Sequence, residues 1–175
     1  MAETIALEIV TPTGVALNRA VNEVTAPSIA GEFGVLPGHL PILVALRTGL
    51  VTLKNGNDET RVAVGPGFAQ VVGDRALLLT ERYAKKEDID IVAVRARLKE
   101  VGDELGSWQG DFDDPKRREL IEEEQWLAAS LELIGDPPQP TVREDTRFVA
   151  KDDFQIVEDS GETDAGAEVE GHTHD

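Results

Sequence analysis

Several features are missing from this 175-residue sequence, and each absence removes a class of function. It contains no cysteine, which excludes disulfide bonds, thiolate catalysis and metal sites built on cysteine. Aromatic residues make up only 5% of the chain, so we expect a modest core. No apolar run approaches the roughly 20 residues of a membrane-spanning helix, and residues 1–4 lack the basic start and apolar stretch of a signal peptide. We therefore expect a cytoplasmic protein with no direct membrane insertion.

Positive charge is also scarce, since 17 Lys and Arg face 34 Asp and Glu and give a formal net charge of −17. The acidic excess is uneven along the chain. Residues 1–87 hold 8 basic and 9 acidic side chains, residues 88–135 hold 6 and 13, and residues 136–175 hold 3 and 12. An acidic surface repels nucleic acid and anionic lipid, because both are polyanions. Nucleic-acid binding is therefore not expected, and the uneven charge marks three regions.

Residues 1–86 have the pattern of an antiparallel β-sandwich. Apolar side chains alternate at every second position near the start, at Ile5, Leu7 and Ile9. Asn-Gly at residues 55–56 and Gly-Asp at residues 73–74 each separate two apolar stretches, as hairpin turns do. Turn signals of this kind recur about every 8–12 residues, which is typical of an all-β sandwich or barrel.

Residues 87–135 change to the period of a helix. Five apolar residues recur in steps of three and four and fall on one helical face: Ile91, Val94, Leu98, Val101 and Leu105. Asp88 and Asp90 stand at the start, where carboxylates favour the positive end of the helix dipole. Asp114 before Pro115 predicts a second helix that ends near Ile134, with one side interrupted by Glu124. We predict a two-helix hairpin, and the pattern leaves open whether it lies folded against the sandwich or extends from it.

Residues 136–175 have the composition of an acidic tail, rich in Asp, Glu, Gly, Thr and Pro. The segment 158–175 holds almost no apolar side chains, which is typical of disorder. A few apolar residues lie before it, too few for a core: Val142, Phe148, Val149, Phe154, Ile156 and Val157. Two interpretations stay open, a disordered tail and a short segment that docks on a partner or on the sandwich.

One stretch of the first region resembles a known family. Residues 31–39 spell GEFGVLPGH and are followed by Leu and Pro, which resembles the signature of the epsilon subunit of bacterial F-type ATP synthases. LEIVTPTG at residues 7–14, GPGFAQV at residues 65–71 and EDID at residues 87–90 fall in the family's order. The resemblance covers residues 5–134 and leaves the tail outside it.

The resemblance implies a β-sandwich of about ten strands followed by a two-helix hairpin, in agreement with the patterns above. It also implies a non-catalytic central-stalk (rotor) subunit at the cytoplasmic face of the inner membrane, which couples ion-driven c-ring rotation to ATP synthesis. In that family the sandwich binds the gamma subunit and rests on the polar loops of the c-ring. The hairpin can reach the alpha and beta catalytic subunits and regulate ATP hydrolysis. No cofactor, metal or catalytic residue is implied.

Four residues are implied at the c-ring end of the sandwich by their position in the motif: Glu32, Phe33, Gly34 and His39. Glycine lets a loop turn tightly and approach a partner closely, and the nearby prolines reduce the entropy lost on docking. Glu32 would pair with a basic group on the c-ring. Without the resemblance, the glycines and prolines are ordinary turn residues and His39 is a hydrogen-bonded loop histidine.

Two properties of the family depend on residues that differ here. Some members bind ATP through an Asp with an Arg three residues later, but Asp90 is followed at that spacing by Ala93, so nucleotide binding is not expected. Many members inhibit ATP hydrolysis through basic helix residues, yet the second helix has no base beyond Arg118. We expect self-inhibition to be weak or to use bases of the first helix. These candidate regulatory contacts are Arg95, Arg97 and Lys99.

Two other classes of function are alternatives to the rotor subunit. A small sandwich or cupin-like metalloenzyme needs clustered His and carboxylate ligands, but His39 is alone in the first region and His172 and His174 lie in the tail. A free-standing β-sandwich interaction module outside ATP synthase is the second alternative. The sequence patterns alone do not separate this module from a rotor subunit.

Overall fold

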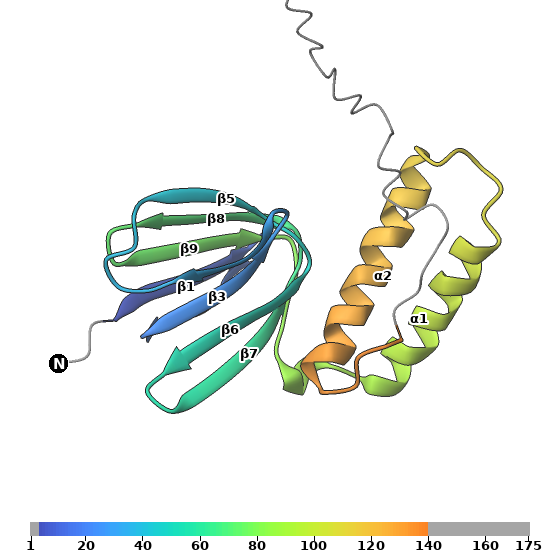
Figure 1. The fold of residues 1–175 in the computed structure, drawn as a ribbon. Coiled ribbons are helices and arrows are strands. Elements are labelled where there is room, and N and C mark those ends of the chain that lie inside the picture. Colours follow the sequence, from blue (N-terminus) through green and yellow to red (C-terminus); the bar gives the residue numbers. More distant parts are fainter. Residues whose placement is uncertain (1–3, 140–175) are drawn as a thin grey trace, which may run out of the picture. The chain divides into compact units, whose positions relative to one another are not determined.

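The computed structural model describes residues 4–139, and within this range a β-sandwich is followed by two helices (Figure 1). The ten strands of that range are β1 Ile5–Thr11, β2 Gly14–Val21, β3 Glu23–Ser28, β4 Gly31–Val35, β5 Ile42–Leu46, β6 Gly49–Asn55, β7 Asp58–Val64, β8 Gly67–Val72, β9 Arg75–Thr80 and β10 Tyr83–Ala84. After them come a short 3₁₀ turn, η1 Lys86–Asp88, and the helices α1 Ile91–Gly106 and α2 Pro115–Leu133. The predicted fold class is confirmed.

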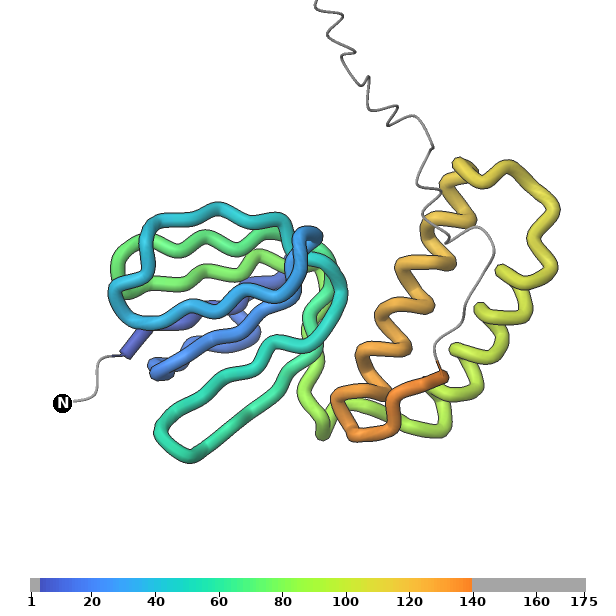
Figure 2. The backbone as a smooth tube through the Cα atoms, in the orientation of Figure 1, coloured from blue at the N-terminus to red at the C-terminus, as the bar shows by residue number. Residues whose placement is uncertain are grey.

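The strands form one hydrogen-bonded sheet that folds over on itself into two layers, as the tube in Figure 2 shows. The order is β10-β7-β6-β3-β5-β8-β9-β1-β2, with β4 paired to the side of β3. A single pair, Ser28 with Leu46, joins β3 to β5, where the sheet passes from one layer to the other. All the strand pairs in the described range are antiparallel except β1 with β9, which run parallel.

The core of the sandwich lies between the two layers and confirms the predicted alternation. Ile5, Leu7 and Ile9 are fully buried, whereas Ala6 between them is exposed. The two predicted turns are also present. Asn55 pairs with Asp58 and Val72 with Arg75, so each turn has two residues, and their glycines take φ of 62° and 58°. That region of backbone space favours glycine, which explains the choice of residue.

The helix starts follow from two aspartates. The Asp90 carboxylate accepts hydrogen bonds from the backbone N–H of Val92 at 3.0 Å and of Ala93 at 3.1 Å, which caps α1. Asp114 caps α2 in the same way, with Pro115 in the first helical turn. Asp88 lies before α1 and caps η1, where its carboxylate accepts from the Lys85 N–H at 3.0 Å.

The two helices pack on each other through a small apolar cluster. Its buried members are Val101, Leu105, Leu120 and Leu127. Val94 and Leu98 are only partly buried against it, and Ile91 at the start of the predicted stripe is exposed. The Trp108 ring packs on the same cluster, and its Nε1–H donates to the Asp111 carbonyl at 3.2 Å.

The sequence left open how the hairpin relates to the sandwich, and in the structure α2 packs against it. Leu133 is buried with Ala63 of β7 and Ala84 of β10, and Trp126 packs beside them. The guanidinium carbon of Arg82 lies 5.9 Å from the centre of the Trp126 ring. Small alanine side chains on the sandwich thus let the helix approach closely at this junction.

Candidate docking surfaces

The motif of residues 31–39 is held by the pairing of β4 with β3. Ser28 fixes the turn between them, because its Oγ donates to the Gly31 carbonyl at 2.6 Å and accepts from the Ala30 N–H at 3.2 Å. Along β4, Glu32 and Gly34 are exposed, whereas Phe33 is half-buried and packs on the sandwich core. Of these three predicted residues, Glu32 and Gly34 are therefore exposed to solvent, whereas the Phe33 ring packs into the sandwich.

His39 lies in the loop after β4 and is bonded within that loop. Its Nδ1 is 2.7 Å from the Leu40 carbonyl oxygen and donates to it, and its backbone N–H donates to the Leu36 carbonyl at 3.0 Å. Among the described residues, no hydrogen bond or ion pair joins His39 to Glu32. These two hydrogen bonds indicate that His39 stabilises the conformation of its own loop.

Large apolar side chains flank the motif without being buried, and they are not among the candidate site residues that the sequence predicts. Ile29 in the turn before β4 is 75% exposed and Leu40 in the loop after it is 79% exposed, with Leu36 also exposed. Large apolar groups that gather on an exposed surface mark interaction sites in soluble proteins, and these three lie at the two ends of β4. The available signal was the placement of apolar residues at turn positions, where polar ones are usual.

A second exposed apolar surface crosses the layer β5-β8-β9-β1-β2. Register pairs place five apolar residues side by side on its outer face, and we call them the apolar row: Ala45, Phe68, Leu79, Val10 and Val15. Phe68 is 56% exposed, and Leu79 and Val15 are similarly open to solvent. Leu43 and Val72 extend the surface along β5 and β8.

Polar side chains border the apolar row. A depression of about 410 Å³ lies beside it on the same face of the sheet. Its polar lining consists of Glu8, Asn18, Gln70 and Arg75. An apolar centre with a polar rim is the usual anatomy of a protein–protein interface.

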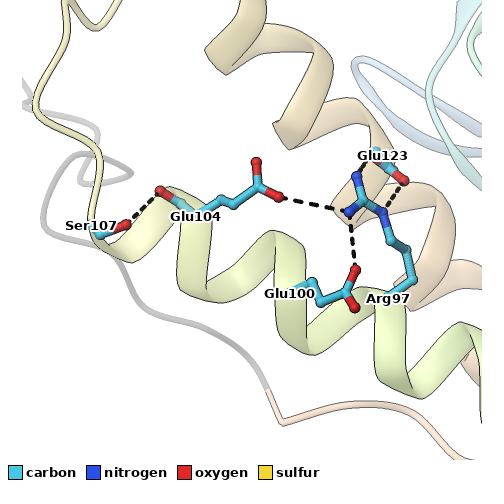
Figure 3. Close-up of polar contacts among 5 residues, drawn as sticks. All are labelled: Arg97, Glu100, Glu104, Ser107 and Glu123. Atoms are coloured by element: carbon cyan, nitrogen blue, oxygen red, sulfur yellow. Dashed lines mark hydrogen bonds and ion pairs between the residues drawn. The ribbon is translucent and has the colours of Figure 1, made fainter.

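The basic residues predicted as regulatory contacts on α1 do not share one environment. The Arg95 guanidinium donates through Nε at 2.9 Å and Nη2 at 2.5 Å to one carboxylate oxygen of Asp136. Arg97 donates through Nε at 2.7 Å and Nη2 at 2.8 Å to the two oxygens of Glu123 on α2 (Figure 3). Lys99 is exposed and makes no ion pair or hydrogen bond within residues 4–139.

Two further carboxylates complete the surroundings of Arg97. Its Nη1 lies 3.2 Å from Glu100 and 3.7 Å from Glu104, both on α1 (Figure 3). The hydrogen bonds from Arg97 hold the pKa of the Glu123 carboxyl below its usual range, and the hydrogen bond to Glu123 raises the pKa of Arg97. Arg95 and Arg97 are thus engaged inside the chain.

Within residues 4–139 no three His, Asp or Glu side chains are grouped so that they could hold a metal ion. Neither helix in that range combines the length and apolar character needed to cross a membrane. The residues of the predicted acidic tail from Val142 to His174, including His172, lie outside the described residues.

The described chain is thus a β-sandwich that carries a packed helical hairpin and large exposed apolar side chains. Similarity to known proteins identifies the family of the chain. The model of the β-sandwich domain of the ATP synthase delta/epsilon chain matches residues 4–86. The ATP synthase epsilon chain of Magnetococcus marinus is 41% identical over 105 residues, which cover 60% of this chain and 77% of that one.

Two other relatives agree. The ATP synthase epsilon chain 2 of Syntrophotalea carbinolica is 40% identical over 98 residues, covering 56% of this chain and 71% of that one. The epsilon chain of Anoxybacillus flavithermus is 42% identical over 94 residues, covering 54% and 70%. The chain belongs to the family of ATP synthase epsilon chains.

Solved structures show the same fold. A chain in the cryo-EM structure of the Euglena gracilis mitochondrial ATP synthase (OSCP/F1/c-ring, rotational state 1) superposes with a TM-score of 0.58 at 24% identity. The match covers 76% of this chain and 78% of that one. A chain in the Tetrahymena thermophila mitochondrial ATP synthase structure of the central stalk and c-ring gives a TM-score of 0.50 at 13% identity. At these identities the likeness is one of fold.

Proposed function

We propose that this epsilon chain is a non-catalytic rotor element whose sandwich clamps the gamma subunit to the c-ring. Rotation of the ring, driven by ions, then reaches the catalytic sites without slip. The observation that carries the proposal is the apolar row, an exposed surface on a sandwich whose own core is already complete. A partner that covers the row removes apolar area from water, which is the main favourable term in protein association.

We assign the apolar row to the gamma subunit. Phe68 and Leu79 are paired neighbours at its centre, on strands held from both sides by the sheet. Burying one such side chain in a partner stabilises the complex by roughly 1.5–3 kcal/mol. The polar lining of the adjacent depression, including Arg75 and Glu8, supplies hydrogen-bonding groups for the rim of that interface.

We assign the motif end to the polar loops of the c-ring. Glu32 and Gly34 are exposed there, so the carboxylate is free to meet a basic group and the glycine lets the partner backbone approach closely. Ile29 and Leu40 supply exposed apolar area on either side. Phe33 and His39 support this surface from behind, through core packing and the loop hydrogen bonds.

The proposal places the chain at the cytoplasmic face of the inner membrane as a peripheral subunit. The c-ring and gamma would hold it there, since the docking surfaces belong to the sandwich. The bases of α1 are less suited to contacts with the alpha and beta subunits than expected, because Arg95 and Arg97 are paired inside the chain. We therefore keep Lys99 as the base of α1 that is available for such a contact.

The first experiment compares Phe68→Asp with Val92→Asp in binding to the gamma subunit of the same organism. Val92 is the matched control, because it is 79% exposed but lies on α1 away from the sheet. We expect Phe68→Asp to weaken the complex about a hundredfold, as loss of a central aromatic contact does, and Val92→Asp to leave it unchanged. Equal binding by the two variants would contradict the assignment of the row.

The second experiment separates the two docking surfaces. Glu32→Lys reverses the charge at the motif end and leaves the row intact. We expect this variant to keep gamma binding and to lose retention on assembled c-ring. If the unchanged chain fails to bind gamma at micromolar concentration, the rotor proposal falls and the free-standing interaction module becomes the better account.

A further inference from the structure

We propose that Arg97 is a clasp that keeps the two helices of the hairpin closed. The inference goes beyond the docking proposals and does not depend on them. Its basis is the position of one guanidinium group between two helices, with carboxylates of both helices around it (Figure 3). Arg97 and Glu123 are 26 residues apart in sequence, so their contact exists only while the hairpin is closed.

The geometry of this contact is that of a specific pair. Arg97 meets both oxygens of Glu123 through two N–H groups, at 2.7 and 2.8 Å, in the fork arrangement that only arginine can make. Its remaining terminal nitrogen faces Glu100 and Glu104 along α1. The Arg97 guanidinium therefore offsets the charge of carboxylates that would otherwise face one another across the helix pair.

The clasp lies beside the apolar cluster, in the half of α1 whose apolar side chains are only partly buried. Along α1, the buried residues are Val101 and Leu105, both in the C-terminal half of the helix. Residues 91–100 contain no buried side chain, and that is the half that carries Arg97 and Arg95. Arg95 adds a second link there, because it reaches Asp136 just beyond the end of α2. Ion pairs thus add to the partial packing of Val94 and Leu98 on the apolar cluster in this half of α1.

The pairing with Glu123 also limits the contacts that Arg97 can make with a partner protein. A carboxylate of any partner must displace Glu123 before it can take the same two N–H groups. Loss of Arg97 would leave Glu100, Glu104 and Glu123 without the base between them, and like charges at such positions repel. Arg82 on the sandwich side also acts on the Glu123 charge, but it does not bridge the helices.

Hydrogen exchange of the full-length chain tests the clasp, with the sandwich amides as an internal reference. We expect Arg97→Gln to speed exchange of the α1 and α2 amides about three- to fivefold, the range for partly exposed ion pairs, and to leave the sandwich amides unchanged. Lys99→Gln is the matched control, because it removes the same charge from the same helix at an unpaired site. Equal hairpin exchange in the two variants would overturn the proposal.

A charge-reversed pair covers the case in which Arg97→Gln disturbs the whole chain. Arg97→Glu alone should open the hairpin further, since it adds a fourth carboxylate to the group. Arg97→Glu combined with Glu123→Arg should restore protection of the hairpin amides, because the bridge between the helices is rebuilt in reverse. Failure of the double variant to recover any protection relative to Arg97→Glu would contradict a clasp.

Discussion

The sandwich and the hairpin are held together by different means. The core of the sandwich contains sixteen buried residues from nearly every strand, many of them with no exposed surface. The hairpin has four buried residues in the cluster between its helices, and the ion pairs of Arg95 and Arg97 add contacts between α1 and the segment from α2 to Asp136. A region with few buried contacts opens at a lower free energy than a close-packed sheet does. The molecule thus combines a close-packed sandwich with a helical pair that is easier to open.

The largest effect we predict is for a core change in the sandwich. Leu7→Ala removes a fully buried side chain and should lower the free energy of unfolding by about 3 kcal/mol, measured by urea denaturation followed by circular dichroism. Leu43→Ala is the control, because Leu43 is exposed on the same sandwich and should change stability by less than about 0.5 kcal/mol. Similar losses of unfolding free energy in Leu7→Ala and Leu43→Ala would mean that the core of the sandwich is not what stabilises the chain.

The same kind of change in the hairpin should have a smaller and more local effect. Leu127→Ala removes a member of the four-residue cluster and should destabilise the hairpin by about 2 kcal/mol. Exchange of α1 and α2 amides should speed accordingly, while amides of β8 and β9 keep their protection. A uniform loss of protection in both regions would show that the hairpin and the sandwich open as one unit.

A change at the junction between the sandwich and the hairpin should have a smaller effect. Arg82→Gln removes the cation that lies over the Trp126 ring and should loosen α2 on the sandwich by about 0.5 kcal/mol. Tryptophan fluorescence in a Trp108→Phe background reports on Trp126 alone, and its emission should shift to the red. Arg19→Gln, on the exposed part of β2, should leave the emission unchanged.

The smallest effect is a pH dependence confined to the hairpin. The pKa of Glu123 is lowered in the folded state, so its pairing with Arg97 contributes stability above the usual pKa of glutamate and loses it as pH falls through the folded value. Glu100 and Glu104 face the same guanidinium, and Arg82 also lowers the pKa of Glu123. Hairpin protection factors should therefore fall below about pH 4. Glu123→Gln should weaken the pH dependence of hairpin protection. An unaltered pH profile in this variant would contradict the link between Glu123 ionisation and hairpin stability.

Much of the fold follows from local signals in the sequence. The alternation of β1, the glycines of the two turns and the caps at Asp90 and Asp114 each depend on neighbouring residues. The parallel pairing of β1 with β9 does not, because it joins segments about 70 residues apart and leaves no local mark. The hairpin stripe was predicted well except at Ile91, which lies beyond the reach of α2 packing.

The candidate surfaces were harder to foresee. The strand Arg75–Thr80 holds three successive leucines, so its pattern does not say which one faces solvent. Leu79 joins the apolar row through its pairing with Phe68 and Val10 on the neighbouring strands. The sequence predicts Arg97 as a regulatory contact, and no local pattern indicates that the register of the hairpin places Glu123 against it. Both features depend on contacts between distant segments, which periodicity does not encode.

The most direct test of the account compares hydrogen exchange of the full-length chain alone and in complex with the gamma subunit. We predict that gamma slows exchange in β8, β9 and the adjoining part of β1, where the apolar row lies, and that it leaves α1 unchanged. Protection confined to the hairpin, with β8 and β9 unaffected, would contradict the assignment of the sandwich as the docking body.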